Sequence, residues 1–147
     1  MWKLDANGRI THWRRFRKTL DTLELEPALQ ATADFWHACP FVPYYLDPEQ
    51  PETWPNPWEL ILDNYYCDLA KCLGMLYTLY LSNHRTDMEI RIYNDPSTTD
   101  LYNLVWIDSG KYVLNFDTDK IVNRTQVPNN LKLLAEFNCQ QLKLHNY

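Results

Sequence analysis

The 147-residue chain has only three glycines, and it contains no apolar run long enough to cross a membrane. The start of the chain lacks the apolar stretch of a signal peptide, so we do not expect secretion. A net charge of −5 gives no overall basic surface. This charge argues against a dedicated nucleic-acid binder, because such proteins need a basic face.

Neither the cysteines nor the histidines show a metal-binding spacing. The four cysteines form no CxxC pair, and without a secretory signal we expect free thiols in a reducing compartment: Cys39, Cys67, Cys72 and Cys139. The four histidines form no HxxxH or HExxH pattern: His12, His37, His84 and His145. We therefore expect no metal site and no cofactor.

Aromatic residues are abundant: six Trp, ten Tyr and five Phe make up 14% of the chain. Aromatic rings bury large areas at little entropic cost, and they are enriched both in cores and at protein interfaces. We expect some of these rings to cover a partner protein. The candidates lie in a proline-rich part of the chain: Trp54, Trp58, Tyr44 and Tyr45.

Hydrophobic periodicity predicts a single α+β domain over residues 1–147, and its first half is helical. One helix is expected from Thr11 to about Leu23 and a second from Pro27 to about Ala38. Six of the nine prolines then fall between residues 40 and 57. That stretch cannot form a regular helix or an inner strand, and it is too apolar for a disordered linker. We predict that residues 39–58 form an ordered, proline-rich strap over the core.

A buried central helix is expected from Asp63 or Asn64 through Leu81, because its apolar residues follow helical spacing and then surround it almost completely. The period then changes to two, which predicts strands at 88–93, 101–107 and 111–116. A short edge strand at 119–123 and a final helix over 128–137 complete the prediction. The expected fold is α+β, with N-terminal helices and a buried central helix packed on an antiparallel sheet of three to four strands.

Cys67 is the one candidate nucleophile. We expect it in the first turn of the central helix, where unpaired backbone N–H groups favour a thiolate. A cysteine there, followed by strands that could present a His and an Asp, is the layout of a Cys-His-Asp hydrolase. The alternative is that Cys67 is a small, buried apolar residue.

One ten-residue run resembles the core helix of the transglutaminase-like fold: Tyr66-Cys67-Asp68-Leu69-Ala70-Lys71-Cys72-Leu73-Gly74-Met75. Residues 104–107 and 110–113, with Asp117, resemble the strand pair that carries that family's His and Asp. The resemblance covers about residues 60–120. Aligned on Asp68 and Ala70, it places Tyr66 at the family's nucleophile. With Asp117 at the family's Asp position, it places Tyr102 at the family's His. No histidine lies between residues 85 and 144, so the resemblance implies a core that lacks the catalytic residues.

A second resemblance covers most of the chain. Segments at 35–42, 54–61 and 102–108 are similar to small structural proteins of contractile-tailed, T4-like phages. This resemblance implies a component of the virion, assembled in the host cytoplasm, that contacts other phage structural proteins in the baseplate or neck. It implies no reaction.

The leading hypothesis is a non-enzymatic structural or assembly component of a tailed phage particle, with no catalytic residues. One alternative is a cysteine-dependent hydrolase or acyltransferase, with Cys67 as nucleophile and His37 or His84 as base. Another is a phage protein that binds and modulates a host protein. A basic cluster could touch DNA, although such clusters are more often the solvated face of an amphipathic helix: Arg14, Arg15, Arg17 and Lys18.

Overall fold

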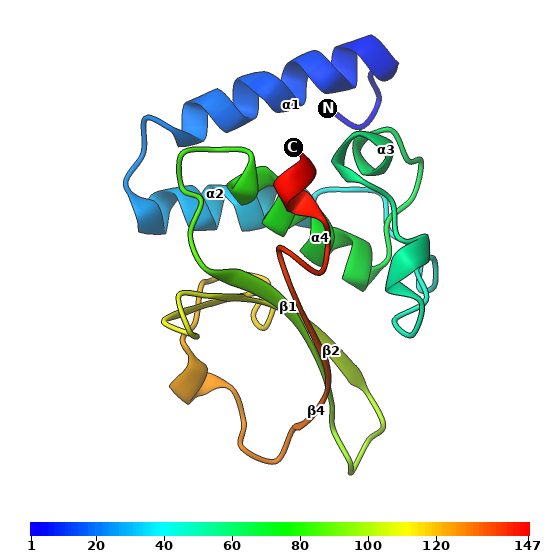
Figure 1. Cartoon of the computed structure of the whole chain (residues 1–147), viewed down its shortest axis with the longest axis vertical. Helices are drawn as coiled ribbons and strands as arrows, with labels where there is room; N and C mark the ends of the chain where they lie inside the picture. Colours follow the sequence, from blue (N-terminus) through cyan, green and yellow to red (C-terminus); the bar gives the residue numbers. More distant parts are fainter.

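Helices and strands segregate into two layers in the structure, a computed structural model that describes residues 1–147. The helices are α1 (Ala6–Leu20), α2 (Leu25–His37), α3 (Pro57–Ile61) and α4 (Asp68–Tyr80). The strands are β1 (Met88–Asn94), β2 (Leu101–Ile107), β3 (Tyr112–Leu114) and β4 (Lys132–Asn138), in the antiparallel sheet order β3-β2-β1-β4. Three 3-10 turns complete the chain: η1 (Pro51–Thr53), η2 (Arg124–Gln126) and η3 (Leu144–Asn146). The predicted α+β class is confirmed, and α4 lies between the outer helices and the sheet (Figure 1).

Helix α4 is the buried centre of the fold, as its apolar sequence predicts. Eleven of its 13 residues are buried. It begins at Asp68, later than the prediction, because the residues before it are extended and pair with the strap. The Tyr66 N–H donates to Pro40 O at 2.8 Å, and the Val42 N–H donates to Tyr66 O at 3.0 Å. Cys67 is consequently the N-cap of α4 and not a residue of its first turn.

One hydroxyl group joins three helices. Thr78 Oγ1 on α4 accepts hydrogen bonds from Trp13 Nε1 of α1 at 3.0 Å and from Trp36 Nε1 of α2 at 2.9 Å. The same hydroxyl donates to Gly74 O at 2.6 Å. A Cβ atom at Gly74 would lie 2.4 Å from the Trp36 ring, so only glycine lets this indole approach the helix so closely. The arrangement fixes α4 against α1 and α2.

A buried arginine ties the beginning of the chain to the segment that precedes α4. Arg9 is 9% exposed, and its guanidinium donates to the carbonyl oxygens of Trp2, Leu4, Ile61 and Asp63. Helix α1 begins at Ala6, and Asp5 is its N-cap, because the Asp5 carboxylate accepts a hydrogen bond from Gly8 N at 2.8 Å. The helix starts earlier than the predicted Thr11. The prediction relied on the spacing of apolar residues, and the mostly polar residues of the first turn show no such spacing.

The strap, residues 39–58, is irregular apart from the turn η1 and the start of α3. Two of its tryptophans pack inward, which anchors it. Trp54 meets Phe137 of β4 edge to face at 5.0 Å between ring centroids, and Trp58 meets Trp13 of α1 at 5.5 Å. Trp54 Nε1 also donates to Asp47 O within the strap at 2.7 Å.

The prediction of a final helix over residues 128–137 is wrong, because β4 occupies most of this range. Its residues are good helix formers, but β1 is buried and requires a hydrogen-bonded neighbour on its second edge. β4 supplies it, with Phe137 opposite Ile90 and Ala135 opposite Ile92 and a register shift after that pair. The predicted edge strand at 119–123 is also wrong, since it is reduced to a single bridge between Val122 and Val113.

Three successive residues with positive φ lie in the loop between β2 and β3. Gly110 has a φ of +86°, and the two residues before it, Asp108 and Ser109, have φ values of +52° and +55°. Asp and Ser are short polar residues, and Asp is among the residues that tolerate this region best after glycine. The tight reversal keeps β3 beside β2.

We predict that Thr78→Val destabilises the protein although it preserves side-chain volume. The substitution leaves two buried indole N–H groups without an acceptor, and each unsatisfied buried donor costs about 1–3 kcal/mol. Urea unfolding followed by tryptophan fluorescence should show a loss of about 3 kcal/mol in the free energy of unfolding. Thr11→Val, at an exposed position of α1, is the control. A similar, small change for both variants would contradict the role of this hydroxyl.

Candidate functional site

A groove of about 700 Å³ opens at the N-terminal end of α4, between the strap and the start of β2. We call it the α4 groove. Its rim is apolar and aromatic, and includes Phe41, Tyr44 and Leu101. Its polar part includes Asp68 and the lining residues Cys67, Lys71, Thr99, Asp100 and Asn103. The start of a buried helix thus lies beside a solvent-accessible hollow.

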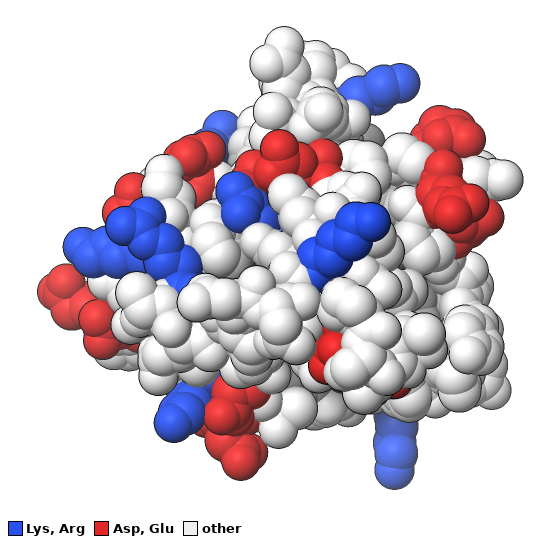
Figure 2. Space-filling model, turned by 90° about the horizontal axis from the view of Figure 1, so that it is seen from below, with Lys and Arg blue, Asp and Glu red and all other residues white.

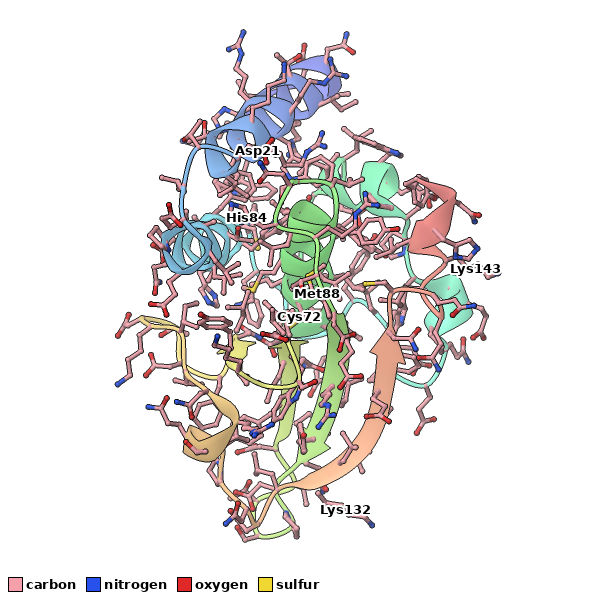
Figure 3. All side chains as sticks on the ribbon, turned by 60° about the vertical axis from the view of Figure 1, so that its left-hand side comes forward. Asp21, Cys72, His84, Met88, Lys132 and Lys143 are labelled. Atoms are coloured by element: carbon pink, nitrogen blue, oxygen red, sulfur yellow. The ribbon has the colours of Figure 1, made fainter.

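A network of polar side chains lies between the start of α4 and the sheet. The Asp68 carboxylate accepts from Asn103 Nδ2 of β2 and from Asn115 Nδ2, which follows β3, both at 3.0 Å. Asn115 Nδ2 also lies 2.9 Å from Asn103 O and 3.2 Å from Cys72 Sγ. The Cys72 thiol donates to Asn103 O at 3.0 Å. Figure 3 shows Cys72 at this junction, between α4 and the strands.

Backbone conformation and burial both constrain the two asparagines. Asn115 has a φ of +71°, in the left-handed region that Asn tolerates better than most residues. Asn103 is 8% exposed, and its Oδ1 has no hydrogen-bond partner. Because the Asp68 carboxylate is only an acceptor when ionised, both amides turn their NH₂ groups toward it. The Asp68 carboxylate therefore sets the orientation of both side-chain amides.

Three of the four cysteines are neutral thiols near pH 7. Burial raises the pKa of Cys72 well above its ordinary value, and the nearby Asp68 raises it further. Burial also raises the pKa values of Cys39 and Cys139, each to about 11. Cys67 is buried as well, and its side chain makes no capping hydrogen bond to α4. All four cysteines are free.

The two histidines proposed as bases lie in different places. His84 Nε2 is 2.7 Å from Leu20 O, at the C-terminal end of α4 and away from Cys72 (Figure 3). His37 ends α2 near the start of α4. Burial lowers its pKa first, and the charge of Lys71 lowers it further. Neither nitrogen of the His37 ring has a hydrogen-bond partner.

Tyr102 and Asp117, which the resemblance aligned with the family's His and Asp, do not contact the Asp68 carboxylate. Tyr102 points to the opposite face of the sheet, where its ring centroid lies 6.0 Å from that of Phe116. Because strand residues alternate, Asn103 is the residue that faces α4. Asp117 lies in a turn, accepting from Asp119 N, whereas Asn115 reaches Asp68. The signal that could have identified Asn103 is a polar residue on the inward face of an otherwise apolar strand.

The four residues expected to contact a partner divide into two pairs. Trp54 and Trp58 are partly buried against the chain's own core. Tyr44 is 93% exposed and Tyr45 is 50% exposed. Of the four, only the two tyrosines are exposed, and Tyr44 lines the α4 groove. Partner binding by all four residues stays a prediction.

The basic cluster of α1 does not form a single exposed patch. Arg17 is partly buried, with its guanidinium over the rings of Trp13 and Trp58 at 4.4 Å and 5.5 Å. On the opposite end of the molecule, which Figure 2 shows from below, acidic and basic side chains are interspersed with wide uncharged areas. No three His, Cys, Asp or Glu side chains are grouped closely enough to hold a metal ion. None of the helices is both long and apolar enough to cross a membrane.

Comparison with known proteins identifies the fold. No protein-family model matches the chain, and a search of curated proteins finds no significant match. Among solved structures, LapG of Legionella pneumophila superposes with a TM-score of 0.71 and 18% identity, over 93% of this chain and 76% of that one. Its calcium-bound form superposes with a TM-score of 0.72 and 17% identity, over 92% and 77%. LapG is a transglutaminase-like cysteine protease, and at this identity the likeness shows a transglutaminase-like fold.

We predict that Asn115→Gly lowers the free energy of unfolding by about 1–3 kcal/mol, because it removes the amide that Asp68 accepts from. Asn115→Ala should be less stable than Asn115→Gly by about 1 kcal/mol, because alanine resists a left-handed backbone. Chemical denaturation of the two variants gives both differences. An alanine variant as stable as the glycine variant would contradict the conformation assigned to residue 115.

Proposed function

We propose that this chain is a non-catalytic binding domain with a transglutaminase-like fold, which holds a protein partner in the α4 groove. The observation that carries the proposal is the pair of asparagine amides at the start of α4. Hydrolysis by a thiol requires a base that removes its proton. The polar side chains that bond to the start of α4 from the sheet side are Asn103 of β2 and Asn115, which follows β3, and amides do not accept protons near neutral pH.

The chemistry of the surrounding groups supports the same proposal. The Asp68 carboxylate is engaged by both amides, and the Cys72 thiol is fully buried with a raised pKa. The His37 ring forms no hydrogen bond to a sulfur. Such a network is suited to holding the helix and the strands in place, because every contact joins two different elements.

The rim of the groove supports a binding role. Tyr44 is 93%, Phe41 58% and Leu101 48% exposed, and all three line the groove. Tyr65, next to the start of α4, is 57% exposed. Clustered apolar side chains that remain in contact with water are typical of protein-binding surfaces.

The sequence resemblance supports a more specific form of this proposal, in which the partner is another structural protein of a tailed phage particle. Immunoblotting of purified particles should then detect the chain. Its presence only in the infected cytoplasm would contradict the virion role and favour a host protein as the partner.

Cysteine-dependent hydrolysis is the second candidate function. Two observations favour it: the fold is shared with LapG, a cysteine protease, and Cys67 lines the α4 groove at the N-cap of α4. His37 would have to act as the base, since it is the histidine near that end of the helix. The reactivity of Cys67 separates this candidate from the non-catalytic one.

We predict that iodoacetamide at pH 7 modifies Cys139 before Cys67. Cys139 is the one cysteine that is partly exposed, whereas Cys67 is 4% exposed. Peptide mapping by mass spectrometry over a time course gives the order. Cys139→Ser is the matched variant, and its remaining thiols should react slowly. Rapid, preferential modification of Cys67 would overturn the non-catalytic proposal.

A further inference from the structure

A second groove, of about 650 Å³, lies under the strap and over the helix-side face of the sheet. We call it the strap groove. It is lined mainly by apolar residues of three strands and the strap, among them Pro48, Leu101, Leu134 and Phe137. Leu134 is 51% exposed, although it belongs to a strand. An apolar groove of this size is large enough to bury several side chains of a ligand.

The strap groove and the α4 groove lie next to each other. Pro48 of the strap and Leu101 of β2 line both of them. A ligand that fills both would extend from the start of α4, across the sheet, to β4. The two hollows differ in chemistry, since Asp68, Lys71 and Asp100 line the α4 groove, whereas Glu49 is the one charged residue that lines the strap groove.

Three of the four charged residues along this path are acidic: Glu49, Asp68 and Asp100. Lys71 is the one cation among the lining residues, and it is already used, lying 3.8 Å from Asp68 and 5.2 Å from the centre of the Phe41 ring. Glu49 and Asp100 form no ion pair. Two uncompensated carboxylates therefore flank a path that is apolar in the strap groove and along the rim of the α4 groove, so the complementary ligand carries both apolar and basic groups.

We propose that the two grooves together bind one extended peptide segment of a partner protein, with apolar side chains under the strap and a basic side chain beside Asp100. This inference rests on the proposed non-catalytic function and identifies the chemistry of its partner. A peptide suits the path because an extended chain presents side chains at regular intervals to hollows that lie one after the other. The acidic lining disfavours nucleic acid.

The chain offers two matched pairs of variants for the test. Leu133 and Leu134 are neighbours on β4, 40% and 51% exposed, and only Leu134 lines the strap groove. Asp100 and Asp119 are both exposed, and only Asp100 lines the α4 groove. Leu134→Asp and Asp100→Asn are the test variants, and Leu133→Asp and Asp119→Asn are their controls.

Fluorescence anisotropy of the full chain would use three fluorescein-labelled octapeptides, which alternate leucine with lysine, leucine with glutamate, and serine with lysine. The leucine–lysine peptide should bind, and each of the other two should bind at least about tenfold more weakly. Each test variant should weaken binding of the leucine–lysine peptide by about tenfold, the effect of losing one important interface contact. The control variants should bind like the unmodified chain.

Two results would overturn the proposals, and they are distinguishable. No binding, or equal effects of Leu134→Asp and Leu133→Asp, would overturn the groove assignment and would leave the non-catalytic function standing. Mass spectrometry of the peptide after incubation tests the function itself. A cleaved peptide would overturn the non-catalytic proposal, whereas an intact peptide that binds with the expected variant pattern supports both. Circular dichroism of each variant confirms that the chain is folded.

Discussion

The contact on which the rest of the structure depends is the Thr78 hydroxyl between two indoles. A hydroxyl has two acceptor positions and one proton, and here all three are used within the buried core. Together with the close packing of Trp36 on Gly74, this fixes both the rotation and the depth of α4. The rotation in turn decides which residues of α4 face the sheet, so the amide network at its first turn depends on a contact near its other end.

The fold alone does not determine the function of this chain, because one fold is compatible with many activities. The side chains at the start of α4 are the ones that decide it. It shares the transglutaminase-like architecture with LapG, and it keeps an open groove where the central helix begins. The side chains that meet there are two amides, a carboxylate and a buried thiol. These groups hold elements together, and the exposed rings around them are suited to binding.

The spacing of apolar residues in the sequence predicted those helices and strands that have one apolar face. The stripe of α4 and the alternation of β1 were sufficient, because burial of these residues depends on local spacing alone. β4 could not be predicted in this way, because its residues favour a helix and only the unpaired edge of β1 makes it a strand. Asn103 and Asn115 were missed for a related reason: their role comes from a contact with Asp68, 35 and 47 residues away in sequence.

The prolines of the strap have a consequence for how a ligand can be recognised. Pro43, Pro48 and Pro51 have no backbone N–H, and they contribute to the walls of the two grooves. At these three positions the strap cannot donate a main-chain hydrogen bond to a strand that lies along the path. Recognition of a peptide along the strap then depends on the side chains of that peptide. This favours discrimination among peptide sequences over pairing with any exposed strand.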